Sequence, residues 1–271
     1  MGRRLVAVLA LARIHAAITA AVLVLLGAHL SQVRDGATLT LLALVVALAT
    51  AGGNALNDVH DHAIDRINRP DRPLPAGAIG VHAATILAWS ALAGALAGAT
   101  LLSCWCVAIA AANVLLLVAY GRWSKRLGTA KAGVVAYLVG SAVLFGALTP
   151  ERIGLAVATL AACAALATAA REILKDVEDL PGDAAAGART LPIAIGPGRA
   201  RLVAGAATAA AVALGLVPWF AGIGGDGYAA GIAAGAVVLA LGIADRDAGR
   251  AQRLVMAGSV IEMAAFYFGL G

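Results

Sequence analysis

Charged residues are scarce in this sequence. They make up 13% of its 271 residues, whereas 62% are hydrophobic and the mean hydropathy is +0.91. These values lie far outside the range of soluble globular proteins. The ten-residue alternating segments of a transmembrane β-barrel are missing as well, and Ala and Gly dominate the apolar runs. The composition therefore predicts an all-α polytopic membrane protein, with a single transmembrane domain over residues 1–271.

Cysteine is also rare. Cys104, Cys106 and Cys163 lie in apolar runs and have no CxxC or Cys/His spacing. This pattern excludes a disulfide framework and a zinc site, and it predicts buried, inert thiols.

A basic domain outside the membrane is missing too, although the net charge is +5. The Lys and Arg residues fall between apolar runs, which argues against a nucleic-acid partner. Nothing in the sequence indicates an obligate protein partner.

Apolar runs long enough to cross the hydrocarbon core, about 20 residues, occur nine times. They cover residues 8–30, 37–57, 80–102, 104–120, 132–149, 153–175, 199–220, 228–244 and 252–270. With nine spans, one side of the membrane carries all but Arg34 and Arg152 of the 20 Lys and Arg residues. The positive-inside rule makes that side cytoplasmic. We therefore expect a multi-pass protein of the cell membrane, in contact with its lipids, whose N-terminus is cytoplasmic.

Charge is concentrated in residues 54–77, NALNDVHDHAIDRINRPDRPLPAG, which contain four aspartates and three arginines. If this stretch continues a helix, one face carries Asn54, Asn57, Asp58, Asp61 and Asp65. Three carboxylates so close repel one another unless a cation lies between them. Hard divalent ions such as Mg²⁺ take such oxygen ligands and share them with substrate phosphates. The stretch therefore predicts a magnesium site at the cytoplasmic side.

The same spacing occurs a second time, in REILKDVEDLPGD, at Asp176, Asp179 and Asp183. Each copy is followed by a related run, RPLPAGAIG from Arg72 and RTLPIAIG from Arg189. Four spans separate the copies, so we expect parallel four-helix repeats around a central cavity, with both acidic clusters on the cytoplasmic side. Two such clusters could hold a magnesium-bound diphosphate from both flanks.

Basic residues near the motifs are candidates for phosphate binding, because Arg makes bidentate contacts and Lys supplies a point charge. They are Arg69, Arg72, Lys125, Arg126, Arg171, Lys175 and Arg189. For Lys125, Arg126 and Lys131, anchoring under the positive-inside rule is an alternative. Together with Arg13, these cations exceed what one metal-neutralised diphosphate requires, so we expect an acceptor that itself carries a phosphate.

Other polar residues have weaker interpretations. His15 and Arg13 on the first span are candidates for acceptor contacts. His60 and His62 lie between the aspartates and are more often exposed loop histidines than acid/base groups. Glu262 is an acidic residue inside a predicted span, so it is a functional candidate by default, and hydrogen bonding to Ser259 or to a neighbouring helix is the structural alternative.

The motifs resemble a known family. Asn57-Asp58-x-x-Asp61-x-x-x-Asp65 followed by NRPDRPLPAG is similar to the first signature of the UbiA superfamily of intramembrane prenyltransferases, and Asp179-x-x-x-Asp183 followed by GARTLPIAIG is similar to the second. The resemblance extends over most of the chain. It implies Mg²⁺-dependent transfer of an isoprenoid chain from its prenyl diphosphate to a lipid-soluble acceptor, inside a helical cavity open to lipid.

The resemblance also implies roles for individual residues. Asn57, Asp61 and Asp65 would hold one Mg²⁺ and Asp179 and Asp183 the other, with Asp58 and Asp176 as supporting carboxylates. Tyr120 and Lys125 resemble a Tyr-and-Lys element after the fourth span, but the usual spacing places the lysine at Ser124, so Lys125 or Arg126 takes that role. Gly133 stands where an Asn is expected. The implied catalytic residues are Asp61, Asp65, Asp179, Asp183 and Lys125, and the implied substrate-binding residues are Arg13, Arg69, Arg72, Tyr120, Arg126, Lys175 and Arg189.

Within the superfamily, REILKDVEDLPGD with RTLPI most resembles the digeranylgeranylglyceryl phosphate synthase branch. That branch implies geranylgeranyl transfer to a glyceryl phosphate lipid through an ether bond. Chlorophyll synthase and homogentisate prenyltransferase share parts of the run, so aromatic acceptors stay open, as does a terpene cyclase of the same superfamily. A secondary transporter fits less well, because the repeats look parallel and the polar groups gather at one membrane face.

Overall fold

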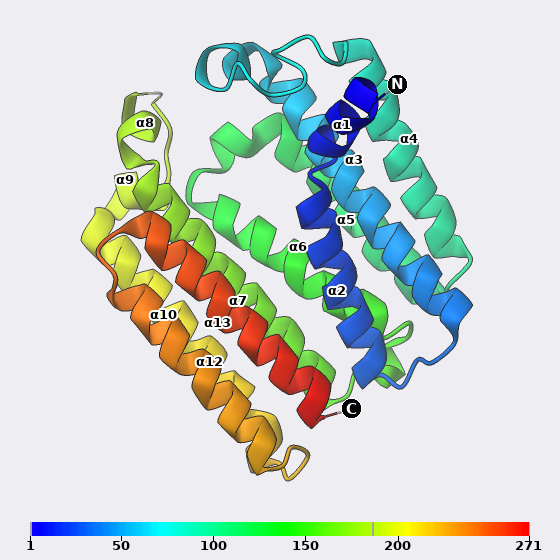
Figure 1. Cartoon of the computed structure of the whole chain (residues 1–271), viewed down its shortest axis with the longest axis vertical. Coiled ribbons are helices and arrows are strands. Elements are labelled where there is room, and N and C mark those ends of the chain that lie inside the picture. Colours follow the sequence, from blue (N-terminus) through cyan, green and yellow to red (C-terminus); the bar gives the residue numbers. More distant parts are fainter. Residues whose placement is uncertain (1, 186, 271) are drawn as a thin grey trace. The chain divides into compact units, whose positions relative to one another are not determined.

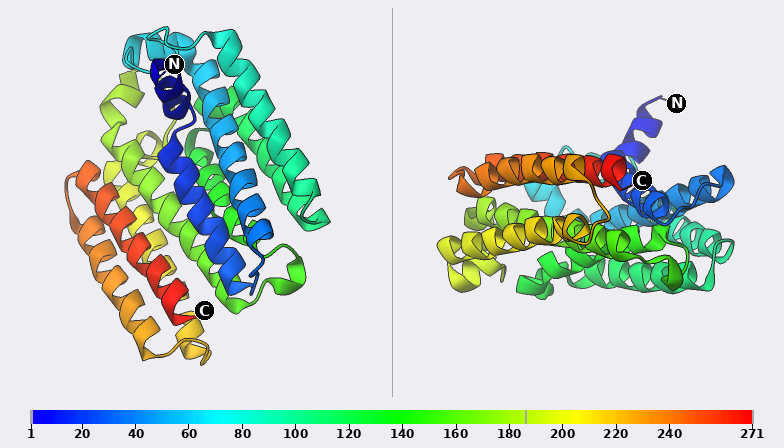
Figure 2. Two further views of the ribbon diagram at one scale, coloured as in Figure 1. Left: turned by 45° about the vertical axis from the view of Figure 1, so that its right-hand side comes forward. Right: turned by 90° about the horizontal axis from the view of Figure 1, so that it is seen from below.

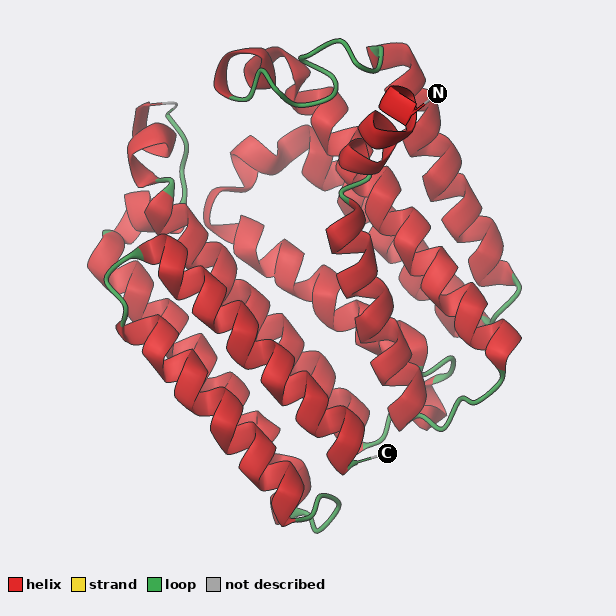
Figure 3. Ribbon diagram, viewed as in Figure 1, coloured by secondary structure: helices red, strands yellow, loops and turns green. Residues whose placement is uncertain are grey.

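The structure, a computed structural model, describes residues 2–185 and 187–270, without the side chains at 2–5, 64, 67, 68 and 122–127. The described chain is helical throughout and contains no strand (Figure 3). Its α-helices are α1 (Gly2–Leu11), α2 (Ile14–Leu30), α3 (Gly36–Asn68), α4 (Val81–Thr100), α5 (Cys104–Leu127), α6 (Lys131–Gly146), α7 (Leu155–Glu178), α8 (Leu180–Ala185), α9 (Leu191–Ile195), α10 (Pro197–Gly215), α11 (Val217–Phe220), α12 (Asp226–Ala244) and α13 (Ala248–Gly269). Short 3₁₀ turns occupy Gly128–Ala130 and Pro150–Arg152. The all-α prediction is confirmed, as expected for segments whose backbone polar groups must be satisfied within lipid.

The helices pack as two compact units. The first contains Met1–Leu25, Val33–Ser124 and Leu148–Pro150, and the second contains Leu26–Gln32, Lys125–Ala147 and Glu151–Gly271.

The first unit is built on α3. Helix α4 lies along it, and α1 packs against it (Figures 1 and 2). The buried core of this unit includes Leu56 of α3, Ala88 and Leu92 of α4, and Val114 of α5. Leu74, from the loop that follows α3, is 3% exposed and belongs to the same core. Burial of this leucine fixes the loop that carries Arg72 next to the acidic end of α3.

The second unit is built on α7. Helices α6, α10 and α13 all pack against it, and α12 packs against α13 (Figure 1). Of the apolar window of α7, 61% is buried, against 28–33% in the other candidate spans. The core near its C-terminal end includes Leu174, Ala200, Leu239 and Val255. The second acidic motif therefore begins on the most enclosed of the candidate membrane spans.

All nine predicted apolar runs fall on helices of the described chain, but only seven helical segments are both long and apolar enough to cross a membrane by length and composition. These are Gly36–Ala63, Val81–Thr100, Cys104–Gly121, Gly128–Gly146, Leu155–Glu178, Pro197–Phe220 and Asp226–Ala244. Helix α2 has 17 residues, and α13 contains Arg250, Arg253 and Glu262. The multi-pass character is confirmed, and the count of nine is not.

The first predicted span, residues 8–30, is wrong as one continuous helix. Helix α1 ends at Leu11 and α2 starts at Ile14. Between them Arg13 has φ +49°, in the left-handed region that a non-glycine residue rarely adopts. Its guanidinium forms an ion pair with Asp58 on α3. The need to pair this charge, rather than leave it in an apolar helix, accounts for the break.

Helix α3 is longer than predicted. It has 33 residues, and its N-terminus is capped by Asp35, which accepts a hydrogen bond from the backbone N–H of Thr38 over 2.7 Å. At 1.5 Å per residue the helix is about 50 Å long, well beyond the roughly 30 Å of a hydrocarbon core. The acidic residues are on its final turns, so the predicted helical continuation through Asp65 is confirmed.

Candidate active site

The first acidic motif is held by ion pairs within the first unit. Asp58 and Asp65 are buried, with 4% and 6% exposure. Arg72 Nη1 donates to Asp65 Oδ2 over 2.6 Å and to Asp58 Oδ1 over 3.3 Å. Arg13 Nη2 donates to the same Asp58 oxygen over 2.6 Å. Both the α1–α2 break and the loop after α3 are therefore tied to this face of α3.

Asn57 completes this face. Its Nδ2 donates to Asp61 Oδ2 over 3.1 Å, while its Oδ1 is buried and accepts no hydrogen bond in the described part of the protein. A buried carbonyl oxygen without a partner is costly, and a bound cation would satisfy it. An amide oxygen beside carboxylates is a ligand set that suits Mg²⁺. This end of α3 fits the predicted metal.

Helix α5 approaches the motif closely through a glycine. A Cβ at Gly121 would lie 3.2 Å from His60 Nδ1, so a larger residue there would require the His60 side chain to shift by a few tenths of an ångström. The neighbouring Tyr120, a predicted substrate contact, is partly buried there. The predicted Lys125 and Arg126 lie beyond it, outside the described side chains.

The two motif histidines are on a helix, which corrects the prediction of loop positions. The His60 Nδ1 lies 2.7 Å from the carbonyl oxygen of Leu56, whereas His62 Nδ1 is buried and has no hydrogen-bond partner in the described chain. His15 is exposed on α2.

The second acidic motif begins on α7 but leaves it. Asp176 is 3% exposed and accepts a hydrogen bond from Lys131 Nζ over 2.9 Å. Asp179 is the exposed C-cap of α7, and Asp183 is on α8. Pro181 prevents the helix from continuing, because it lacks a backbone N–H and restricts the residue before it. Identical spacing therefore gives one continuous helix in the first motif and a bent segment in the second.

Electrostatics in this second cluster also favour a cation. Burial raises the pKa of Asp183 above its ordinary value, and the negative charges of Asp176 and Asp179 act in the same direction, whereas Lys131 and Lys175 oppose it. No three His, Cys, Asp or Glu side chains of the described residues come together closely enough to hold a metal alone. Mg²⁺ usually takes one or two protein carboxylates together with substrate phosphates and water, so such an incomplete set still fits it.

Several predicted phosphate-binding cations are already paired with carboxylates. Arg13 and Arg72 contact the first motif, and Arg171 Nη2 and Lys175 Nζ lie 2.9 and 3.8 Å from the buried carboxylate of Glu172. Arg69 and Arg189 are exposed and make no ion pair within the described residues. The surplus of positive charge counted from the sequence is therefore too large. The spacing of cations alone did not reveal Lys131 or Glu172 as partners of the motif region.

Arg189 is positioned by its backbone. Gly128 has φ +52°, and a Cβ there would lie 2.8 Å from the carbonyl oxygen of Arg189. Only glycine permits both this conformation and this close approach. The turn after α5 thus seats the start of the RTLPIAIG run, whose Leu191 packs against the core of the second unit.

Comparison with known proteins identifies the family. The UbiA prenyltransferase family matches residues 13–261. The chain belongs to this family. It is 45% identical over 231 residues to digeranylgeranylglyceryl phosphate synthase of Methanoculleus marisnigri, covering 85% of this chain and 82% of that protein. A solved structure of digeranylgeranylglyceryl phosphate synthase has a TM-score of 0.84 at 29% identity and covers 98% of both chains. A UbiA homologue from Archaeoglobus fulgidus, bound to GPP and Mg²⁺, has a TM-score of 0.71 at 17% identity, over 96% of this chain and 98% of that chain.

These similarities confirm the family that the two motifs predicted, and the relatives bear the name of the predicted branch.

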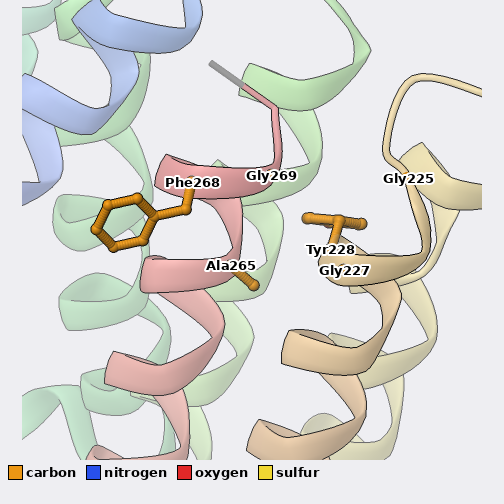
Figure 4. Close-up of a pocket in the computed structure, with 6 residues that line it drawn as sticks. All are labelled: Gly225, Gly227, Tyr228, Ala265, Phe268 and Gly269. Carbon is orange, nitrogen blue, oxygen red and sulfur yellow. The ribbon is translucent and has the colours of Figure 1, made fainter.

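This UbiA protein also has a hollow of about 360 Å³ lined by Gly225, Gly227, Tyr228, Ala265, Phe268 and Gly269 (Figure 4). It lies at the end of α13 opposite Gln252, which contacts Glu178 of α7. Sixteen residues of helix separate Gln252 from Phe268, about 24 Å. The hollow is therefore not part of the acidic site.

Two expectations about buried polar groups need correction. Ser259 donates to the Val255 carbonyl and not to Glu262, whose Oε1 is buried without a hydrogen-bond partner in the described chain. Cys104 is exposed, whereas Cys106 and Cys163 are buried as predicted.

Proposed function

We propose that this protein is a Mg²⁺-dependent prenyltransferase that transfers a geranylgeranyl group from its diphosphate to the free hydroxyl of geranylgeranylglyceryl phosphate. The observation that carries the proposal is the 45% identity, over 85% of the chain, to a digeranylgeranylglyceryl phosphate synthase. The geometry agrees with it, because each unit contains a cluster of buried or half-buried acidic groups flanked by cations.

The motif residues have distinct roles in this reaction. Asn57, Asp61 and Asp65 would hold one Mg²⁺, and Asp179 and Asp183 the other. When bound, the ions neutralise the diphosphate and so promote its departure. Arg69 and Arg189, which are exposed and make no ion pair with the side chains that the structure describes, donate charge-assisted hydrogen bonds to phosphate oxygens. Tyr120, Lys125 and Arg126 are further substrate contacts supported by the sequence resemblance.

The bond changes balance without a further reactant. The hydroxyl oxygen of the acceptor bonds to C1 of the geranylgeranyl group as the bond from C1 to the diphosphate oxygen breaks. The hydroxyl proton passes to the leaving diphosphate or to a motif carboxylate. The reaction gives two products. One is an ether lipid that still carries the phosphate of the acceptor, and the other is inorganic diphosphate.

The membrane arrangement that we infer has nine spans, with α2 and α13 crossing as well as the seven longer segments, in one domain around a central cavity. The bias of the basic residues supports a cytoplasmic N-terminus and cytoplasmic motifs. Parallel repeats are supported by a local similarity between two pairs of helices. The pair α3 and α4 resembles the pair α7 and α10. In both, the run after the motif ends in a glycine that caps the next helix, Gly80 or Gly196.

The test is a comparison of acceptors. Purified protein receives Mg²⁺ and geranylgeranyl diphosphate with geranylgeranylglyceryl phosphate, its dephosphorylated form, 4-hydroxybenzoate, homogentisate or no acceptor, and every product is identified by mass. We expect an ether product with the phosphorylated lipid, formed at least about tenfold faster than with the dephosphorylated one, as loss of a charged contact of about 1.4 kcal/mol would give. Equal transfer to both lipids would remove the proposed role of the arginines. Transfer only to an aromatic ring, or a cyclic product without acceptor, would refute the proposed acceptor.

A further inference from the structure

Five arginines gather at one end of the second unit, outside both acidic motifs. Arg199 and Arg201 are on the first turns of α10, Arg246 is in the loop between α12 and α13, and Arg250 and Arg253 are on the first turns of α13 (Figure 1). These five residues form what we call the basic patch. Arg199, Arg246 and Arg253 are exposed and make no ion pair with residues that the structure describes.

Arg201 holds the patch together. Its Nη1 donates to the carbonyl oxygen of Asp245 over 2.8 Å, and its Nη2 donates to the carbonyl oxygen of Arg246 over 2.7 Å. The loop between α12 and α13 is therefore fixed to α10, although 44 residues separate Arg201 from Asp245. Both acceptors are neutral carbonyl groups, so the guanidinium keeps its positive charge.

The acidic groups of this region are already used within the protein. Asp245 pairs with Arg250, whose Nε lies 3.2 Å from Oδ2. Asp247 is the N-cap of α13 and accepts from the backbone N–H of Arg250 over 2.8 Å. Glu178 of α7 accepts from Gln252 Nε2 over 2.5 Å. The loop and the patch together contain five arginines and two aspartates, so three positive charges remain.

Exposed apolar side chains begin one turn away from the arginines. Leu202 is 73% exposed and follows Arg199 by three residues, and Met256 is 57% exposed and follows Arg253 by three residues. Residues at this spacing share one face of a helix. Leu241, 58% exposed, is on the last turn of α12. Helices α10 and α12 contain candidate membrane spans, so the patch is at the level where hydrocarbon gives way to headgroups.

We infer that the basic patch binds the phosphate groups of anionic lipid headgroups in the adjoining leaflet. A guanidinium fork matches phosphate geometry and forms bidentate, charge-assisted hydrogen bonds. The neighbouring apolar side chains select a lipid over a soluble anion, because the ligand must carry its phosphate directly above an acyl chain. A headgroup bound here contacts both α10 and the start of α13. This surface is additional to the proposed reaction and does not depend on it.

Positive charge on one side of the membrane does not by itself require this arrangement. The positive-inside rule depends only on the number of Lys and Arg residues in a loop. It does not require that the loop be bound to another helix, as Arg201 binds it, or that its aspartates be paired internally. Both features leave Arg199, Arg246 and Arg253 close to the lipid with their charges available.

The experiment measures which lipid is enriched beside the patch. In a cysteine-free background, Ala257→Cys places a bimane label on an exposed position one turn after Arg253, and Ala230→Cys places one near the other end of α12. The protein is reconstituted in phosphatidylcholine nanodiscs that contain doxyl-labelled phosphatidylglycerol or doxyl-labelled phosphatidylcholine. The ratio of bimane quenching by the two lipids gives the local preference for the anionic headgroup.

We expect a preference of about fivefold or more at position 257 and about one at position 230, since each basic residue near an anionic surface contributes about fivefold. Replacing Arg199, Arg246 and Arg253 together by Gln should lower the preference at 257 to about one. Replacing the same three by Lys should keep most of it, because the charges remain. The matched control is Arg152→Gln, an exposed arginine elsewhere in the second unit, which should change nothing.

Three results would overturn the inference. The first is an equal preference at positions 257 and 230 in the wild type. The second is an unchanged preference at 257 in the triple Gln variant, whose exposed substitutions should leave the protein folded. The third is complete loss of the preference when inorganic phosphate is added in excess at constant ionic strength, which would identify a site for soluble anions. Inorganic phosphate without effect, together with loss in the triple Gln variant, supports lipid binding.

Discussion

Replacing Asn57 by Asp tests whether a metal binds beside this side chain. Asn57 Nδ2 donates to Asp61 Oδ2 over 3.1 Å, so Asn57→Asp turns an attractive contact into a repulsion between two carboxylates. Two unit charges 4 Å apart repel by about 4 kcal/mol at an effective dielectric constant of 20, whereas exposed pairs interact by about 1 kcal/mol or less. Both side chains are half-buried, so we expect a loss of about 2 kcal/mol without metal. For a chain of this size that lowers Tm by about 4–8 °C.

The assay is thermal unfolding in detergent, with EDTA or with saturating Mg²⁺. Magnesium should restore most of the lost stability, because a divalent ion neutralises the added carboxylate, and a tenfold gain in affinity adds about 1.4 kcal/mol at saturation. Asn54→Asp is the matched control, since Asn54 lies one turn earlier on the same face and donates to the Ala12 carbonyl over 3.4 Å. It should lose the same stability under both conditions. If Asn57→Asp behaves like this control, the metal does not bind at Asn57.

Two further predictions concern catalysis and topology. Asp61→Ala and Asp179→Ala should each lower turnover by about 100-fold or more while the protein stays folded, because each removes a ligand from a different ion; wild-type activity in either variant would exclude the two-ion site. In a cysteine-free background, cysteines at the exposed positions Thr129 and Ala185 should be labelled only from the cytoplasm, and one at Ile223 only from outside. Labelling of 129 and 223 from the same side would contradict the orientation.

The chemical character of the site could be predicted from the sequence, because it depends on local composition and spacing. A chain with so little charge must be membrane-embedded, and carboxylates that recur at helical spacing must either face a cation or repel one another. The continuation of α3 through Asp65 follows from the same periodicity. The bend at Asp179 had a local signal as well, since Pro181 stands between the last two aspartates of the motif.

Which charges neutralise one another was decided only by the tertiary structure. Asp58 lies 45 residues from Arg13, and Asp176 lies 45 residues from Lys131, so no spacing rule connects them. In the sequence, the only sign that the first span breaks is Arg13, a lone arginine in an apolar run. Its partner, Asp58, is identified only by the packing of α1 against α3. Sequence determined where the charged groups are along each helix, because hydropathy and periodicity are local properties. Packing determined which of these groups pair with one another. A buried carboxylate needs a cation as partner, and the fold decides which cation lies within about 3 Å of it.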